Sequence, residues 1–531
     1  MKYRSDPIQI SAVLSLTFVI VTGCATSQET GSQFQITPNR QAALDSISPV
    51  SLRKHLEYIA SDELGGRDTP SPGLDLAADY IAKQFRVAGL EPVGDDGYFQ
   101  TARWRTRRPN EDSFALSVST SHGDITLSLD QISTTPGSAV DLVDVGLIKI
   151  DFDESELPGK DVIAGKVVLT EIPDFRRVDR VQRRELFSAQ RRFMTRMAEL
   201  EVVAVLSVDR HSPRGSGFGR PPLIDPENVR PSRRGPQSKV PRITIHHEEL
   251  VALFDEAGEV ALDATITLRI GAPEEQPVTL RNVIGLLRGS DPKLRDTYVL
   301  VTAHYDHIGT RAGMPEGEDN IFNGANDDGS GTVSVIELAG ALTKLKPRPR
   351  RSILFMCVFG EERGLLGSRY YGRNPIFPIE ATVADINLEQ IGRTDSTEGP
   401  QVLNASMTGF DFSEVGEIFA RAGQLTGIEV YKHETNSDSY FGRSDNQALA
   451  DQGVPAHTIC VAFAYEDYHG AGDHADKIDY ENMAAVNRMI ATGILMIADN
   501  DHEPRWYEWN TKASRYLKAW RDRRGLEAEK D

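Results

Sequence analysis

The sequence of 531 residues contains very little cysteine: Cys24, Cys357 and Cys460 are the only three. The last two lie inside apolar runs at residues 353–359 and 458–464, a placement typical of buried thiols in strands and not of a disulfide. We therefore expect a fold whose core is sufficient without covalent cross-links.

Positive charge is also in deficit, since 59 lysine and arginine residues face 78 aspartate and glutamate residues, for a formal net charge of −19. A surface of this sign repels a phosphate backbone, so no nucleic-acid partner is predicted. Apolar residues make up 39% of the chain, which is enough to build folded domains. The acidity by itself identifies no partner.

The apolar stretch near the N-terminus, residues 8–21, is too short to span a bilayer as a mature helix. It follows a basic start, which is the pattern of a secretion signal. It ends in Val21-Thr22-Gly23-Cys24, which resembles the lipobox of bacterial lipoproteins, and a plain cleaved signal is the alternative. We expect a signal peptide over residues 1–24, a polar tether over residues 25–47, and an exported bacterial lipoprotein of the cell envelope, attached to a membrane only through a lipid on Cys24.

The chain is too long for one compact core, so two folded units are expected. Apolar residues recur at helical spacing over residues 51–90, with a turn at Gly66-Arg67, and predict two helices. Residues 113–270 contain short β-like runs and, at residues 210–239, a stretch rich in Pro, Gly, Arg and Ser that is typical of an exposed loop. From residue 282 onward, strands and helices alternate as they do in a parallel sheet covered by helices.

These patterns predict an α/β fold with a mostly parallel central sheet flanked by helices and a β-rich domain inserted into it. The C-terminal tail is charged and is expected to form a helix whose tryptophans, Trp506, Trp509 and Trp520, pack on the main domain. The expected boundaries are residues 48–108 and 279–502 for the two parts of the main domain, 109–278 for the inserted domain and 503–531 for the tail.

Histidine and carboxylate side chains follow four of the predicted strands, at the point where each strand ends. Open parallel sheets bind their ligands at the carboxyl ends of the strands, so these side chains are expected to share one rim. A glycine-rich loop at residues 323–331, just before a predicted helix, adds acidic groups to the same rim. The residues in question are His304 and Asp306, then Glu361 and Glu362, then Glu389, then His469, with Asp327 in the glycine-rich loop.

Nitrogen and oxygen donors of this kind suit zinc, and the lack of nearby cysteine argues against a purely structural zinc site. One catalytic zinc needs three protein ligands, and this rim offers more than three. Two metal ions about 3.5–4 Å apart need a bridging carboxylate, which the glycine-rich loop can supply. A further carboxylate that binds no metal can take a proton from water, and the adjacent pair Glu361-Glu362 fits that division of roles.

Five motifs contain these residues in order along the chain: His304-x-Asp306, Gly324-Ala325-x-Asp327-x-x-Ser330-Gly331, Glu361-Glu362-x-Gly364-Leu365-x-Gly367-Ser368, Asn387-Leu388-x-x-Ile391-Gly392 and Tyr468-His469. Together they resemble the motifs of the M28 family of zinc peptidases, which bind two zinc ions per chain. Any one of the motifs alone would be weak, whereas five in order are specific. The inserted region resembles a protease-associated (PA) domain through residues 157–162 and 165–169.

Carried over position by position, the resemblance implies a role for each residue of the rim. His304 and Glu389 would serve one zinc ion, Glu362 and His469 the other, and Asp327 would bridge the two. Glu361 would be the general base, Asp306 would orient the ring of His304, and Tyr468 would donate to the developing oxyanion.

Two positions depart from the family pattern. The family usually has aspartate where this chain has Glu389, which adds a methylene but keeps the oxygen donors. Asp385, on the same face of the same strand, is an alternative contributor, and a weakened first zinc site is the competing outcome. The second departure is Ser444-Asp445-Asn446, where relatives often have histidine after the aspartate. Histidines outside the motifs are interpreted as ordinary polar groups, with His307 as a residue that could line the cleft.

The resemblance implies an exopeptidase that acts on peptides, and an aminopeptidase is the favoured form. A carboxypeptidase or a glutaminyl cyclase on the same scaffold is the alternative within enzymes, because fold alone does not settle the reaction. A receptor-like binding protein is the alternative outside enzymes. The oligomeric state is left open.

Overall fold

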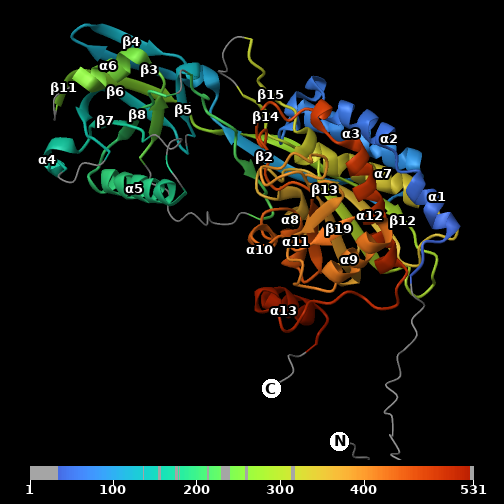
Figure 1. The fold of residues 1–531 in the computed structure, drawn as a ribbon. Coiled ribbons are helices and arrows are strands. Elements are labelled where there is room, and N and C mark those ends of the chain that lie inside the picture. Colours follow the sequence, from blue (N-terminus) through green and yellow to red (C-terminus); the bar gives the residue numbers. More distant parts are fainter. Residues whose placement is uncertain are drawn as a thin grey trace, which may run out of the picture.

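The computed structural model describes residues 34–526, apart from residues 136, 153–156, 174–177, 179, 212–213, 229–239, 257–260 and 312–316. These residues form two lobes, a large one around a ten-stranded sheet and a smaller one around an eight-stranded sheet (Figure 1). The predicted α/β class is confirmed. The predicted signal peptide, its lipid-bearing Cys24 and the first part of the tether lie outside the described residues. The rest of the expected tether is not a polar linker: it contains helix α1, Pro38–Asp45, whose Ala43 and Leu44 are buried in the core of the large lobe.

The main sheet has four parallel strands at its centre. Residues in these strands are buried on both faces, which accounts for their nearly continuous apolar sequences. The order across the sheet is β19-β18-β20-β17-β13-β16-β12-β2-β9, with β1 beside β12. The bounds are β13 Tyr298–His304, β16 Ser352–Val358, β17 Thr382–Leu388, β20 Ala456–Cys460, β12 Glu274–Leu287, β2 Phe99–Arg108, β9 Leu223–Ile224, β1 Glu91–Pro92, β18 Asn404–Met407 and β19 Glu429–Tyr431.

Antiparallel pairs flank this centre. β12 runs antiparallel to both β16 and β2, and β18 runs antiparallel to β20. The expected parallel arrangement is therefore present in the central strands and in the outer pair of β18 and β19, whereas the other neighbouring strands of the sheet run antiparallel. The four parallel strands are the ones whose carboxyl ends meet at a single edge, so the difference leaves the predicted rim in place.

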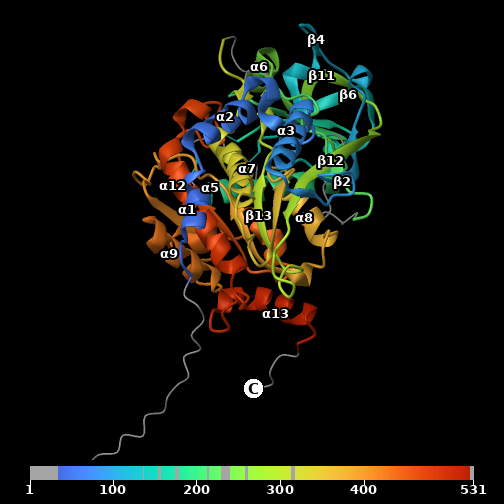
Figure 2. The ribbon, with the colours of Figure 1, turned by 90° about the vertical axis from the view of Figure 1, so that its right-hand side faces the viewer.

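Helices cover both faces of the main sheet. Alternate residues of each strand face opposite layers, so Val299 and Val301 of β13 join one core and Leu300 joins the other. Figure 2 shows several helices of the first layer packed beside one another over the sheet. This layer contains α1 Pro38–Asp45, α2 Pro49–Ile59, α3 Pro72–Ala88, α7 Gly331–Leu342, α9 Val415–Thr426 and α12 Tyr480–Ala498, and the opposite layer contains α8 Leu366–Arg373, α11 Asn446–Ala450 and α13 Ser514–Arg523.

The two N-terminal helices predicted from apolar spacing are present as α2 and α3. Ser48 and Ser71 cap their first turns with side-chain oxygens, and a proline follows each cap. α3 ends at Gly89, whose φ of 80° gives the left-handed cap that glycine accepts without strain. The expected turn at Gly66-Arg67 closes a short 3-10 segment, Asp62–Arg67, between them.

The smaller lobe has its own sheet and its own cores. The chain enters it from β2 and returns through β12, and these two strands pair with each other over ten residues. α6 packs on one face of the sheet, and α4 and α5 pack on the other. The order is β4-β3-β11-β6-β7-β8-β10-β5, with β3 Ala115–Thr120, β4 Gly123–Leu127, β5 Ile132–Thr134, β6 Val140–Lys149, β7 Val167–Glu171, β8 Ala204–Val208, β10 Arg242–Ile245, β11 Ala261–Ile270, α4 Lys160–Ile163, α5 Arg180–Glu199 and α6 Glu248–Glu256.

The β-rich character of this lobe agrees with the sequence patterns, and its resemblance to a PA domain stays a prediction. The stretch at residues 210–239 was expected to be an exposed loop throughout. Instead, β9 within it pairs with β2 and extends the main sheet. A strand of two residues is too short to show a periodic pattern, which is why the sequence did not predict it.

The C-terminal segment packs on the main lobe through some of its tryptophans. Trp506 is buried, donates its ring N–H to the carbonyl of Gly453 and stacks on Tyr516 of α13. Trp520 is partly buried against the same core, whereas Trp509 is exposed, contrary to expectation. Cys357 and Cys460 are buried free thiols, as expected.

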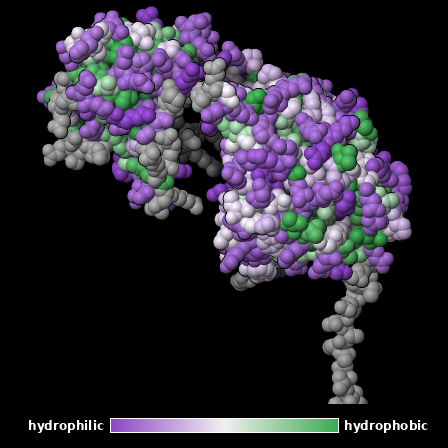
Figure 3. Space-filling view, turned by 45° about the horizontal axis from the view of Figure 1, so that its top comes forward, coloured by the Kyte–Doolittle hydropathy of each residue, from purple (hydrophilic) through white to green (hydrophobic). Residues whose placement is uncertain are grey.

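Both lobes present a mainly hydrophilic surface in the face shown in Figure 3, with scattered hydrophobic patches. Among the described residues, no helix combines the length and the apolar character that a membrane crossing requires.

Candidate active site

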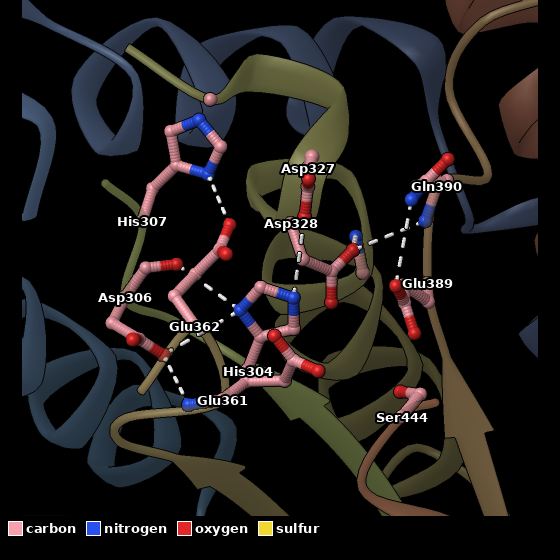
Figure 4. A network of polar contacts seen from close by, with 12 residues as sticks. His304, Asp306, His307, Asp327, Asp328, Glu361, Glu362, Glu389, Gln390 and Ser444 are labelled. Carbon is pink, nitrogen blue, oxygen red and sulfur yellow. Dashed lines mark hydrogen bonds and ion pairs between the residues drawn. The ribbon is translucent and has the colours of Figure 1, made fainter. Parts of the chain in front are cut away.

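The carboxyl ends of four central strands lie at one edge of the main sheet, beside the loop that precedes α7. Figure 4 shows residues from the ends of three of them, β13, β16 and β17, next to Asp327 of that loop. His304 is the last residue of β13, Glu361 and Glu362 follow β16, and Glu389 follows β17 directly. Asp327 comes from the glycine-rich loop, and His469 comes from the segment after β20. The structure thus brings together the groups that the sequence placed on one rim.

His304, Asp327 and Glu389 form the first cluster. Each offers one donor atom, and these atoms all lie within 4.8 Å of one another. The Nε2 atom of His304 is 3.3 Å from Oδ1 of Asp327. Ser444 lies next to Glu389, and its hydroxyl acts to lower the pKa of that carboxyl against the larger effect of burial. Three nitrogen and oxygen donors at this separation can hold one metal ion.

Glu362 and Asp327 form the second cluster together with two histidines. The Nε2 atom of His469 is 3.1 Å from Oδ2 of Asp327 and 3.2 Å from Oε1 of Glu362. The Nδ1 atom of His307 is 3.0 Å from the same glutamate oxygen. Asp327 therefore turns one oxygen toward each cluster, which is the placement that a bridging carboxylate needs.

Asp306 fixes two parts of this site at once. Its backbone carbonyl is 3.1 Å from Nδ1 of His304, and its carboxylate is 3.5 Å from the same nitrogen. The carboxylate also accepts hydrogen bonds from the backbone N–H of Glu361, at 3.0 Å, and from the hydroxyl of Thr69, at 3.1 Å. The expected orienting contact with His304 is present, and the hold on the Glu361 backbone is an addition that the sequence did not predict.

The loop that carries Asp327 is held by a second buried acid, Asp473. Its carboxylate accepts from the backbone N–H of Asn326, at 3.0 and 3.1 Å, and from that of Asp327, at 3.1 Å. Asp328 accepts from the backbone N–H of Gly331, which starts α7, at 3.0 Å. These bonds fix the backbone on both sides of the bridging carboxylate.

Residues 282–494 match the family model described as peptidase family M28. This part of the chain is a peptidase family M28 domain. It contains all five motifs singled out in the sequence and every residue of the two clusters. The M28 domain begins in β12, so the helices α1 to α3 and the smaller lobe lie outside the matched residues.

Several curated relatives that match this part of the chain are fungal. A protein of Leptosphaeria maculans named "Probable zinc metalloprotease" is 30% identical over 204 residues, which are 37% of this chain and 44% of that protein. A protein of Aspergillus oryzae named "probable leucine aminopeptidase 2" is 24% identical over 304 residues, or 51% of this chain and 54% of that protein. The chain spans about half the length of the curated relatives it matches.

Among solved structures, an aminopeptidase from Aneurinibacillus sp. strain AM-1 is similar in fold, with a TM-score of 0.54 and 19% identity. The match covers 89% of this chain and 97% of that one. A zinc aminopeptidase from Bacillus subtilis gives a TM-score of 0.53 at 17% identity, covering 88% and 97%. At these identities the likeness concerns the fold, which includes both lobes.

The expected localisation as an exported bacterial lipoprotein is contradicted by the curated relatives. They are fungal and include proteins named "Vacuolar membrane protease" from Pyricularia oryzae and Verticillium alfalfae, which are 37% and 35% identical over 94 residues, 8% of each relative. The physical reason for the error is the low specificity of the signal. A short apolar stretch followed by a four-residue motif that ends in cysteine also occurs in sequences that carry no lipid anchor.

Burial is the largest influence on the pKa values of the acidic side chains around the M28 clusters. Burial raises the pKa of Glu389 to about 7 and raises that of Glu361 well above its usual range. Burial acts in the same direction on Glu362, but its contacts with His307 and His469 prevail and lower its pKa to about 2. Contacts with Asp327 and Glu362 raise the pKa of His469 to about 10.

The buried donor atoms fit a cation. Nε2 of His304 and Oε1 of Glu362 are buried and have no hydrogen bond of acceptable geometry among the described residues. Burying such atoms unsatisfied costs about 1–3 kcal/mol each, a cost that a bound ion would remove. The donors are imidazole and carboxylate with no thiolate, which suits zinc in an open site. The residues present therefore fit the metal that the family implies.

Tyr468 lies at the edge of the M28 site. Its ring stacks on that of His469, with centroids 4.2 Å apart, and 45% of the residue is exposed. Burial of its hydroxyl and the nearby carboxylates raise its pKa, so the phenol stays protonated and can donate a hydrogen bond. Its expected role at an oxyanion stays a prediction.

Arg67 is a buried residue that holds the backbone next to the site. The sequence indicated only a turn at this position. Its fully buried guanidinium donates to the carbonyls of Tyr305, Asn323 and Gly324 at 2.8, 2.6 and 3.0 Å, and also to that of Ile59. Burial lowers its pKa to about 10, so it remains charged at neutral pH. It ties the N-terminal helices to the segment after β13 and to the glycine-rich loop.

Replacing Arg67 with leucine is expected to lower the free energy of unfolding by at least about 3 kcal/mol, because several buried carbonyls lose their donor. Urea unfolding followed by circular dichroism measures this. The matched control is Arg421→Leu, at an exposed position of α9, with an expected change within about 0.5 kcal/mol. Equal midpoints for the two variants would contradict the proposed support.

Proposed function

We propose that the protein is a zinc-dependent aminopeptidase that removes N-terminal residues from peptides, with Glu361 as general base. The observation that carries the proposal is the pair of donor clusters that share Asp327, with Glu361 beside them. Membership of the matched segment in peptidase family M28 supports peptide hydrolysis. The names of relatives and of similar structures, zinc metalloprotease and aminopeptidase, support the same reaction.

In this proposal His304, Asp327 and Glu389 hold one zinc ion, and Asp327, Glu362 and His469 hold the other. When bound, the ions supply Lewis acidity toward the scissile carbonyl and lower the pKa of water. Their charge also neutralises the buried carboxylates that hold them.

The chain's own groups carry the proton and fix the geometry. Glu361 takes the proton from the attacking water and delivers it to the leaving amine. Asp306 holds the Glu361 backbone and the His304 ring in one geometry. Tyr468 donates a hydrogen bond from its phenolic O–H to the oxygen that becomes negative as the carbonyl is attacked.

The charge of the site favours an amino terminus over a carboxyl terminus as the group bound near the reaction. Asp306 and Asp445 are buried carboxyls close enough to act electrostatically on His304, beyond those that would hold zinc. A substrate ammonium is attracted by such a surplus of acidic groups, whereas a substrate carboxylate is repelled. This supports an aminopeptidase over the carboxypeptidase alternative.

The test uses aminoacyl p-nitroanilides and short peptides, each with a free and with an acetylated N-terminus. We expect cleavage of the free forms only, loss of activity with a chelator, and its return when zinc is added. Cleavage that is insensitive to the chelator, or no cleavage over a broad panel in the presence of zinc, overturns the proposal. Preferential cleavage of N-acetylated peptides from the C-terminus would instead identify a carboxypeptidase.

Glu389 is proposed as a ligand in place of the family's usual aspartate, and Asp385 is not. Glu389 belongs to the first cluster, whereas Asp385 is fully buried within β17 and accepts a hydrogen bond from Thr302 at 3.0 Å. Burial raises the pKa of Asp385 to about 8, so its carboxyl is largely neutral at pH 7. A neutral, hydrogen-bonded carboxyl is a poor zinc ligand.

Glu389→Ala is expected to bind one zinc ion where the wild type binds two and to lose at least about 100-fold in kcat, since it lacks a ligand of the first ion. Asp385→Asn is the matched control, because the amide replaces a neutral carboxyl of the same shape, and it should keep both ions. Metal content by mass spectrometry and kcat on one p-nitroanilide give the two readouts. Loss of zinc from Asp385→Asn, with none from Glu389→Ala, would reverse the assignment.

A further inference from the structure

His307 lies in the segment just after β13, three residues after His304, and its side chain belongs to the second cluster. Its backbone N–H donates to the carbonyl of Arg67 at 3.2 Å, and its side chain is fully buried. Figure 4 shows the ring turned toward Glu362. The donor atoms of His307, Asp327 and Glu362 all lie within 4.8 Å of one another.

The ring nitrogens of His307 lack the partners that a buried structural histidine normally has. Neither makes a hydrogen bond of acceptable geometry with the residues that the structure describes, although Nδ1 lies 3.0 Å from Oε1 of Glu362. His457, another fully buried histidine, differs: its nitrogens contact the hydroxyl of Ser413 at 2.6 Å and the carbonyl of Thr408 at 2.9 Å. A buried imidazole that has no hydrogen bond and lies beside two carboxylates has the environment expected of a metal ligand whose ion is not bound.

The neighbouring backbone leaves room for this ring. A Cβ atom on Gly324 would lie 2.5 Å from Cγ and Cδ2 of His307, closer than atoms can approach. Gly324 also has φ of 58°, in the region that glycine adopts without strain. Glycine at position 324 thus allows the imidazole to sit against the loop that carries Asp327.

His469 reaches the same oxygens from a more exposed segment. Its side chain is 40% exposed, and its backbone has φ of 55°, whereas His307 is fully enclosed. The two rings face each other edge to face, with centroids 5.8 Å apart. Two imidazoles from different parts of the chain therefore converge on Glu362.

We propose that His307 is a ligand of the second zinc ion, in addition to Asp327, Glu362 and His469. The inference rests on the proposed zinc function and assigns that ion a fourth protein donor. His307, Asp327 and Glu362 then make up three donors even without His469, which is the number that a zinc site with an open position uses. The second ion is thus held mainly by enclosed groups, and the exposed His469 completes its coordination.

The first experiment measures zinc binding by the full chain after removal of metal, for the wild type and for His307→Ala, His307→Gln and His469→Ala. We expect both His307 variants to lower the affinity for the second zinc ion by more than about 100-fold. Removal of a group that only hydrogen-bonds to a ligand lowers metal affinity by about 10- to 100-fold. His469→Ala should still bind two ions, and His307→Ala combined with His469→Ala should bind one. His474→Ala is the matched control, a half-exposed imidazole on the same segment as His469 that contacts Asp319 and belongs to neither cluster.

The second experiment needs no variant, so it remains decisive if a substitution prevents folding. X-ray absorption at the zinc edge of the fully loaded wild type counts imidazole ligands. Three histidines over two ions give about 1.5 per zinc, and two histidines give about one. Two bound ions with about one imidazole each, or wild-type affinity in His307→Ala, overturns the role of His307 alone. A wild-type chain that binds fewer than two zinc ions overturns the proposed zinc pair itself.

Discussion

Glu361→Gln is expected to keep both zinc ions and the fold while kcat falls by about 1000-fold, within the range of 100- to 10,000-fold that a general base contributes. Glu361 belongs to neither donor cluster among the described residues, so the change removes a base and not a ligand. Its backbone N–H is held by Asp306 and is unaffected by the amide. Glutamine has nearly the same shape but cannot accept a proton at neutral pH.

Steady-state kinetics on one p-nitroanilide, with zinc content measured on the same preparation, checks this expectation. Glu361→Asp is the companion variant, because it keeps a carboxylate but shortens the side chain by one methylene. Its kcat should lie between those of the wild type and Glu361→Gln. A Glu361→Gln protein that retains more than about a tenth of wild-type kcat would exclude a base at this position. Loss of zinc from the same variant would instead make Glu361 a ligand.

The rim was predictable from the sequence because it follows from a rule about sheets. Strands that are buried on both faces read as apolar runs, so the ends of β13, β16 and β17 can be located within a residue or two, whereas β20 ends at Cys460, four residues before its apolar run does. Parallel neighbours place those ends on one edge. His304, Glu362 and Glu389 therefore had to lie close together once the four strands were recognised.

The supporting residues of the site could not be predicted in the same way. Asp473 holds the backbone of Asp327 across 146 residues of sequence, and no local pattern marks that contact. The sequence indicated only that Arg67 belongs to a turn. Its guanidinium donates to four carbonyls from three segments that are far apart in the sequence, so no local pattern marks these contacts. His307 had one signal, its position just after a strand that ends in a candidate ligand, and a lone histidine was given its usual interpretation as a polar residue.

The antiparallel flanks of the main sheet were missed for a different reason. An apolar strand gives no indication of its direction, and the helical crossovers that signal parallel pairing are absent between β2 and β12, where the whole smaller lobe intervenes. The paired ribbon of β2 and β12 spans the junction between the two lobes. Direction was thus predictable only where strands and helices alternate.

Asp327→Asn is expected to have a larger effect than any substitution of a residue that belongs to one cluster. The carboxylate is almost fully buried and places Oδ1 3.3 Å from His304 and Oδ2 3.1 Å from His469. Its burial opposes ionisation, but the contacts with His304 and His469 hold its pKa below the usual range, so the native group is an anion. We expect weakened binding of both zinc ions and a fall in kcat of at least about 1000-fold.

Asp328→Asn is the matched control, since Asp328 is equally buried and adjacent but belongs to neither cluster. Burial raises the pKa of Asp328 well above its usual range, and an asparagine oxygen can still accept from the backbone N–H groups of Gly331 and Gln390. The control should keep two zinc ions. Among the described residues only Asp327 serves both clusters, so its variant must weaken the binding of both ions together, whereas Glu389→Ala weakens the binding of one. Independent loss of a single ion from Asp327→Asn would show that the clusters do not share this carboxylate.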